Sequence, residues 1–251
     1  MSTTLAFLGE FGDAIEFIVE GTTTREGNDV GGLQFLELTW EHMKLSLVAM
    51  AIACAVAVPV GLWLGHIRKG EFFAVSASNV GRAVPSLALI AFFVAYLGVG
   101  FTNVTLALVL LAIPPILTNA YVGVSQVDND TVDASRGMGM TETEIVRRVE
   151  LPLALPLVFG GVRTSMVNVL ATATIAPLAG VDSLGDPIIN VNTYGETGRL
   201  AASIVVAALA VFTELSLGAA QRAVTPKGLK LESDQQSRRR IPFLTRREAT
   251  T

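Results

Sequence analysis

Residues 127–156 read VDNDTVDASRGMGMTETEIVRRVELPLALP, a charged segment of helical character between apolar segments long enough to cross a membrane. Gly139 lies between two methionines and can take a backbone conformation with positive φ that other residues resist. Thr141 can cap the helix that follows, and Glu144, three residues on, completes a capping box. Pro152 is expected to end the element and redirect the chain into the next membrane helix. The stretch therefore predicts two short helices, joined by a glycine turn, that protrude from a membrane.

The second of these short helices is expected to be amphipathic. Ile145, Val146 and Val149 recur at helical spacing and form a narrow apolar face. Glu142 and Arg148 are expected to face water. The element should therefore be able to fold outside the membrane core.

The composition of the whole chain indicates a membrane protein. Hydrophobic residues make up 51% of the 251 residues and charged residues only 16%, and the mean hydropathy is +0.55. Residues 45–65 contain no Asp, Glu, Lys or Arg, and neither do residues 83–127. A helix needs about 20 apolar residues to cross the hydrocarbon core, so the second run must fold back on itself near residues 98–103. The expected fold class is all-α, a polytopic membrane protein with five transmembrane helices, or six if one segment is split near Arg82 and Pro85.

Lys and Arg residues between the apolar segments predict the orientation of the chain. The five segments are expected at 43–65, 72–97, 103–125, 154–180 and 198–220. Arg68 and Lys69 place the first connection in the cytoplasm, because basic residues are enriched on that side. Residues 181–197 carry acids and no Lys or Arg, so they face outward. Five crossings then put the N-terminus outside, the C-terminus in the cytoplasm and the loop at 126–153 in the cytoplasm.

Three parts are expected along the chain. Residues 1–38 form an external N-terminal extension, residues 39–225 the transmembrane domain with its protruding loop at 128–152, and residues 226–251 a basic cytoplasmic tail. Apolar residues among the acids of the extension could form an amphipathic helix, or the extension could pack loosely. The tail has few apolar residues and is expected to be disordered.

The protruding loop resembles the EAA loop of bacterial and archaeal ABC importer permeases, the cytoplasmic element that binds the ATPase. The resemblance depends on the joint spacing of small, apolar and proline residues, which an ordinary amphipathic loop would not need. The residues that the resemblance assigns to ATPase coupling are Asp133, Ala134, Ser135, Gly137, Gly139, Glu144, Val149, Leu151 and Pro152. Asp133 stands where the family has Glu, and Ser135 where it has a second Ala; both substitutions retain charge or size.

Further stretches are similar to the osmoprotectant branch of these permeases, which transport glycine betaine, carnitine and choline. They are Pro85 to Leu89, Pro114 to Gly123, Ala134 to Met140 and Glu150 to Pro156. The similarity covers about residues 40–225. The chain departs from the branch at residues 180–185, which read GVDSLG where the family usually has Gly-Gly-Leu-Gly.

The resemblance implies a type I ABC importer permease fold and a permease subunit that translocates a compatible solute. The implied partners are two copies of an ATP-binding subunit, a second permease chain, identical or paralogous, an extracytoplasmic substrate-binding protein and the lipid bilayer, without nucleic acid. The partner ATPase would bind ATP and Mg, and this chain would have no cofactor, no metal and no catalytic residue. The lack of a G-x-x-x-x-G-K-[ST] motif agrees with that division of labour. The implied location is the plasma membrane of a prokaryote.

Candidate residues for the translocation pathway are prolines, polar side chains and charges within the apolar runs. They are Arg82, Pro85, Ser86, Pro114, Asn119 and Arg163. Proline removes a backbone donor and loosens a helix, and charges at membrane depth usually face the bundle or water. Arg82 and Arg163 could instead reach the interface or form structural pairs, and Glu214, near the cytoplasmic end of the last segment, could pair with an Arg.

Two other functions remain open from the sequence. An ABC permease for an amino acid or another small polar solute would have the same loop. An ion-coupled secondary transporter would more often show inverted repeats and intramembrane acids. The chain has two Trp and three Tyr, few for an aromatic cage around a quaternary ammonium group, so high-affinity capture is expected to belong to the separate binding protein. His42 and His66, the only histidines, lie too far apart for a local metal motif.

Overall fold

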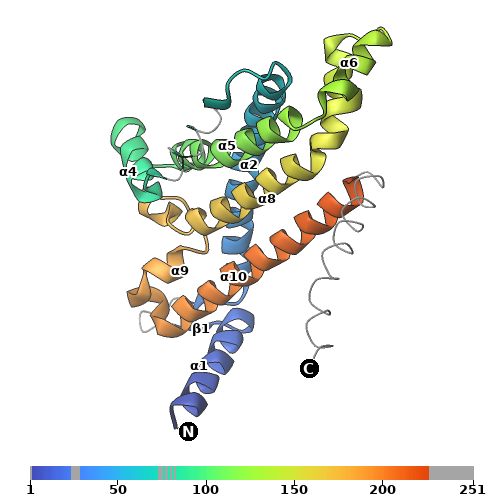
Figure 1. Ribbon diagram of the computed structural model, residues 1–251. Coiled ribbons are helices and arrows are strands. Elements are labelled where there is room, and N and C mark those ends of the chain that lie inside the picture. Colours follow the sequence, from blue (N-terminus) through green and yellow to red (C-terminus); the bar gives the residue numbers. More distant parts are fainter. Residues whose placement is uncertain are drawn as a thin grey trace, which may run out of the picture.

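The computed structural model describes residues 2–23, 29–72, 76, 79, 81 and 83–225, which form an almost entirely helical protein (Figure 1). The helices are α1 (Ser2–Val19), α2 (Leu33–His66), α4 (Ser86–Leu97), α5 (Phe101–Ser125), α6 (Asn129–Gly137), α7 (Glu142–Ile145), α8 (Leu151–Ala173), α9 (Asp186–Ile189) and α10 (Val191–Val224). A π-helical turn, η1 (Val146–Glu150), and a 3-10 turn, η2 (Ala176–Ala179), complete them. Two-residue strands β1 (Thr22–Thr23) and β2 (Asp29–Val30) pair antiparallel beside α1.

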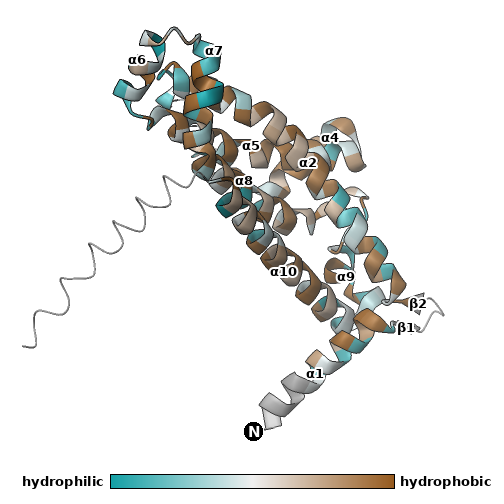
Figure 2. Ribbon diagram, turned by 90° about the vertical axis from the view of Figure 1, so that its right-hand side faces the viewer, coloured by the Kyte–Doolittle hydropathy of each residue, from teal (hydrophilic) through white to brown (hydrophobic). Residues whose placement is uncertain are grey.

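Four helical stretches within the described ranges are long and apolar enough to cross a membrane. They are α2, α5, the run from α7 through α8, and α10, and α4 is a shorter apolar helix. The all-α, polytopic fold class is thereby confirmed. Apolar residues cover these helices, whereas α6 and α7 form a polar end beyond them (Figure 2).

Helix α5 is the centre of the bundle and packs on α2 and α8. Glycines bring the three backbones together. A Cβ atom on Gly61 of α2 would lie 2.6 Å from the Cβ atom of Ala120, and one on Gly161 of α8 would lie 2.8 Å from the carbonyl oxygen of Pro115. Such small residues allow close helix approach in a membrane, where van der Waals contact drives association.

A second apolar cluster joins the N-terminal residues to the far end of the bundle. Phe17 of α1 meets Phe35 of α2 edge to face, with ring centroids 5.6 Å apart. Both rings are buried in one cluster with Tyr194 and Ala201 of α10. Helix α1 is therefore packed against the membrane helices, and it lies at the end opposite α6 (Figure 1).

Several segments differ in length from those that apolar runs predict. Helix α2 begins at Leu33, ten residues before the expected segment, because its charged residues face outward while Phe35 and Leu38 continue the buried face. The segment expected at 154–180 ends as an α-helix at Ala173 and continues as η2. The segment expected at 72–97 is described as a helix over α4, and part of its first half, including Arg82, lies outside the described residues.

Candidate functional site

The polar end of the molecule is a helical hairpin of α6 and α7. The Asp128 side chain caps α6 by accepting a bond from the backbone N–H of Thr131 (3.2 Å). Gly139 turns the chain with φ of 84°, which confirms the predicted positive φ. The predicted capping box of Thr141 and Glu144 is present in full at the start of α7. Local sequence signals thus determine the shape of this hairpin.

The hairpin has an apolar core of its own. Ile145 is fully buried against Val127 and Val132, with Met140 and Val149 packed at the edge. Two residues of the predicted apolar face, Ile145 and Val149, therefore hold α6 and α7 together, whereas Val146 packs against residues of α2, α5 and α8. The outward surface of the hairpin is polar, with Met138 as an apolar exception that is 76% exposed.

The connection from the hairpin to the membrane corrects the prediction for Pro152. The chain runs from α7 through η1 into α8 as one helical stretch, so Pro152 neither ends the element nor redirects it. Pro152 lies at the start of α8, and the wider turn of η1 precedes it, with the N–H of Leu151 bonded to the carbonyl of Val146. A proline cannot donate to the carbonyl four residues back and its ring crowds that group. A π-helical turn, with its longer hydrogen-bond spacing, accommodates it without a break.

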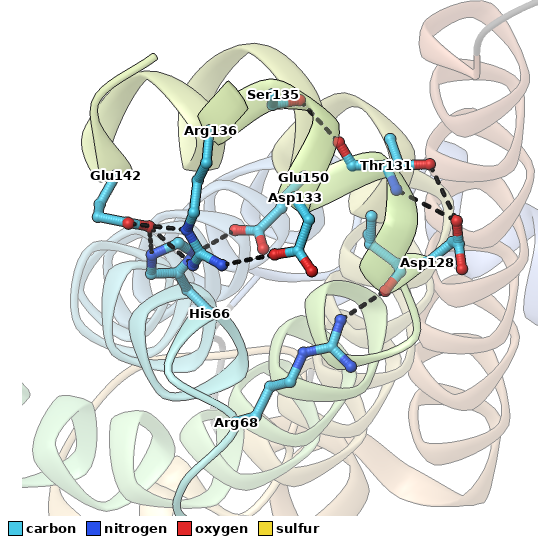
Figure 3. A network of polar contacts seen from close by, with 10 residues as sticks. His66, Arg68, Asp128, Thr131, Asp133, Ser135, Arg136, Glu142 and Glu150 are labelled. Atoms are coloured by element: carbon cyan, nitrogen blue, oxygen red, sulfur yellow. Dashed lines mark hydrogen bonds and ion pairs between the residues drawn. The ribbon is translucent and has the colours of Figure 1, made fainter. Parts of the chain in front are cut away.

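His66, at the end of α2, is bonded on both sides by carboxylates from this region (Figure 3). Its Nδ1 lies 2.8 Å from Oε2 of Glu150, and its Nε2 lies 2.9 Å from Oε2 of Glu142. The His66 and Glu150 side chains are 4% and 2% exposed, whereas that of Glu142 is 51% exposed. An imidazolium donates from both nitrogens and would satisfy both carboxylates. This arrangement fastens the end of α2 to η1 and to α7.

Arg136 extends the network across the hairpin. Its guanidinium makes two bonds to Glu142 (2.9 and 3.1 Å) and a third to Asp133 (3.0 Å). The paired bonds to Glu142 raise the pKa of Arg136 above its usual value. Arg68, just after α2, donates to the carbonyl of Val127 at 2.6 Å. The last residue of α2 and the turn after it are thus together bonded to both ends of the hairpin.

The residues predicted for ATPase coupling fall into three groups. Asp133, Ala134, Gly137 and Gly139 are exposed on the outer surface of the hairpin. Two residues shape the hairpin itself: Ser135 is buried and donates to the carbonyl of Thr131, and Glu144 caps α7. Val149, Leu151 and Pro152 are partly buried where the hairpin meets α8.

The candidate pathway residues are not one cluster. Ser86 and Pro114 line a cavity of about 230 Å³ together with Asn168 and Thr172. Arg163 lines a neighbouring cavity of about 430 Å³ that also includes Asn168.

Asn119 and Pro85 are not among the residues that line these cavities. Asn119 donates to the carbonyl of Pro115 and lies against α8. Pro85 is the exposed residue before α4. Arg82 lies outside the described residues.

Sequence reasoning missed His66 and Glu150 as partners. The two residues are 84 positions apart; His66 follows one apolar run, and Glu150 precedes another. One signal was available: the predicted topology places the end of the first segment and the start of the fourth on the same side of the membrane. Two ionisable residues at those ends could therefore have been paired.

The chain is similar to transport proteins of known families. Residues 57–227 match the family described as "Binding-protein-dependent transport system inner membrane component". The chain is 38% identical over 200 residues to a glycine betaine/carnitine/choline transport system permease protein of Bacillus subtilis, covering 79% of this chain and 92% of that protein. A carnitine transport permease protein of Listeria monocytogenes matches with the same identity and coverage.

Solved structures show the same fold. An inward-facing MetNI methionine ABC transporter chain superposes with a TM-score of 0.66 at 22% identity, covering 76% of this chain and 96% of that chain. A chain of an amino acid ABC transporter crystallised with histidines gives a TM-score of 0.55 at 20% identity. At these identities the likeness establishes the fold alone.

Proposed function

The chain belongs to the family of binding-protein-dependent transport system inner membrane components, and from this premise we propose that it is the permease subunit of an ATP-driven importer for a compatible solute. Family membership makes it a transport component that crosses the cell membrane several times. Relatives named for glycine betaine, carnitine and choline support the solute class.

The observation that carries the proposal is the α6–α7 hairpin beyond the apolar helices (Figure 2). A transporter driven by a separate ATPase needs a firm element outside the membrane on which that ATPase can act. The hairpin has its own core, is bonded to α2 through His66 and continues into α8 without a break. A force on its exposed surface is therefore transmitted to two membrane helices.

The remaining subunits follow from this role. We propose two copies of an ATP-binding subunit, each against one hairpin, which hold the ATP and Mg and hydrolyse the nucleotide. A second permease chain, identical or paralogous, completes the pathway, and an extracytoplasmic binding protein delivers the solute. Closure of the ATPases on ATP draws the two hairpins together and opens the pathway outward.

Uptake into proteoliposomes tests the proposal. With the ATPase, the permease partner and the binding protein present, uptake of radiolabelled choline or glycine betaine should require ATP and persist when ionophores collapse the ion gradients. Uptake driven by an ion gradient without ATP would make the chain a secondary transporter. ATP-dependent uptake of an amino acid, without uptake of choline, carnitine or glycine betaine, would show that the chain serves an amino acid importer and that the proposed solute class is wrong.

The proposed orientation predicts a labelling pattern. Met138 on the hairpin and Asn192 near the start of α10 are both exposed, and they lie on opposite sides of the membrane in this topology. In a Cys54→Ser background, an impermeant thiol reagent added to intact cells should label Asn192→Cys and leave Met138→Cys unlabelled. After permeabilisation, both positions should react. Labelling of Met138→Cys alone in intact cells would reverse the orientation.

A further inference from the structure

A polar groove lies between α8 and α10, within the membrane-spanning part of both helices. Its volume is about 430 Å³. The residues that line it are Arg163, Thr164, Val167, Asn168, Ala210, Val211, Glu214 and Leu215. Four of these side chains are polar or charged. No catalytic or coupling role described above uses them.

An ion pair forms part of the groove wall. Nε of Arg163 lies 2.8 Å from Oε1 of Glu214, and the two side chains are 37% and 41% exposed. Arg163 is about 18 Å along α8 from its first residue, and Glu214 is about 15 Å from the end of α10, at 1.5 Å per residue. Charges among the apolar residues of a membrane helix are costly against lipid and are normally found facing a bundle interior or a water-filled cavity. The position of the pair therefore favours a groove that faces water over one that faces lipid.

The groove continues toward α5. Asn168 borders both this groove and the smaller cavity of Ser86, Pro114 and Thr172. Thr164 and Asn168 are exposed one turn apart on α8, so polar groups follow one face of that helix. A small polar solute could pass from one cavity to the other along this face.

The charges of the pair fit a zwitterion. A guanidinium carries five N–H donors and a carboxylate accepts about four bonds, so each partner can bind a further group while the pair stays near. The described contacts of Arg163 are those with Glu214 and with the Gln221 side chain (3.2 Å). A solute with a carboxylate at one end and a quaternary ammonium at the other presents the charges that Arg163 and Glu214 attract.

We propose that this groove is a transit site for the carried solute, in which Arg163 binds a carboxylate and Glu214 a quaternary ammonium group. The assignment rests on the proposed import of compatible solutes. It makes Arg163 a specificity-determining residue that favours zwitterions, such as glycine betaine and carnitine, over choline, a cation without a carboxylate. Capture from outside the cell remains the task of the binding protein.

The test measures the ratio of glycine betaine uptake to choline uptake in proteoliposomes with all subunits present. Arg163→Gln should lower that ratio on the order of tenfold, the loss expected for a hydrogen bond to a charged group. Arg163→Lys, which keeps a positive charge, should restore most of the ratio. Glu214→Gln should lower the uptake of both solutes, since both carry the ammonium group.

Gln221→Leu is the control for a purely structural role. Gln221 bonds Arg163 and also donates to the carbonyl of Pro156 (2.7 Å), so its loss loosens α8 from α10 but leaves both charges. The control should leave the uptake ratio unchanged. If Arg163→Gln leaves the uptake ratio unchanged, including by an equal loss of both solutes, Arg163 does not select zwitterions and the transit site is refuted. A wild-type importer that moves choline but no zwitterion would refute it as well. A wild-type complex that moves none of these solutes would instead refute the proposed function.

Discussion

Replacing Gly139 by valine is expected to lower ATP-dependent uptake at least tenfold and to release the ATPase during purification. Gly139 has φ of 84°, and among the described residues beyond its two chain neighbours no heavy atom lies within 4 Å of a Cβ placed there. The effect therefore comes from backbone strain, roughly 1–3 kcal/mol for a side-chain-bearing residue in this region, and not from a clash. The turn would reopen and misplace α7. Uptake and copurification of the ATPase are measured on the same preparations.

Gly139→Asn is the matched control, because asparagine tolerates the left-handed region far better than valine. It should retain most of the uptake and hold the ATPase. If both variants transport normally, the hairpin does not couple the ATPase to the membrane helices. If both fail alike, space at the ATPase surface matters at this position and the backbone does not.

Removing Glu150 is expected to cause the largest loss of stability among single changes in the hairpin region. Glu150 and His66 are both almost fully buried and lie 2.8 Å apart. Removing the carboxylate leaves a buried imidazole nitrogen without its hydrogen-bond partner, which costs roughly 1–3 kcal/mol. Glu150→Ala should therefore lower the apparent melting temperature in detergent and reduce uptake, as α2 is no longer fastened to η1.

Glu142→Ala tests whether the stability loss depends on the burial of the carboxylate or only on its presence beside His66. Glu142 bonds the same imidazole at 2.9 Å, but its side chain is 51% exposed. Exposed pairs contribute about 0–1 kcal/mol, so this variant should melt close to the wild type. Equal melting temperatures for the two variants would show that the buried pair contributes no more than the exposed one.

The features that the sequence predicts well are local. The positive φ of Gly139 and the capping box of Thr141 and Glu144 depend on neighbours within four residues, and both are present. Apolar runs identify the membrane helices because their length alone meets the thickness of the bilayer. The sequence indicates that Glu214 can pair with an Arg but does not say which one, and the structure pairs it with Arg163.

The features that the sequence does not predict depend on tertiary packing. Pro152 carries the signal of a helix end, yet the π-helical turn before it accommodates the ring and the helix continues. Helix α2 starts ten residues early because Phe35 and Leu38 find partners in α1 and α10. Partners that are distant in sequence leave no periodic pattern, so the contact between His66 and Glu150 cannot be predicted from periodicity.

The turn η1 sets the angular phase between the hairpin and α8. One residue of an α-helix corresponds to a rotation of about 100°, and a π-helical turn holds about one residue more than an α-helical one. Winding the same five residues of η1 as plain α-helix would rotate α8 by about that angle relative to α7. Either Glu150 would leave His66, or Thr164 and Asn168 would turn away from their groove. The His66–Glu150 contact and the groove face of Thr164 and Asn168 therefore depend on the π-helical geometry of η1 as well as on the identity of their side chains.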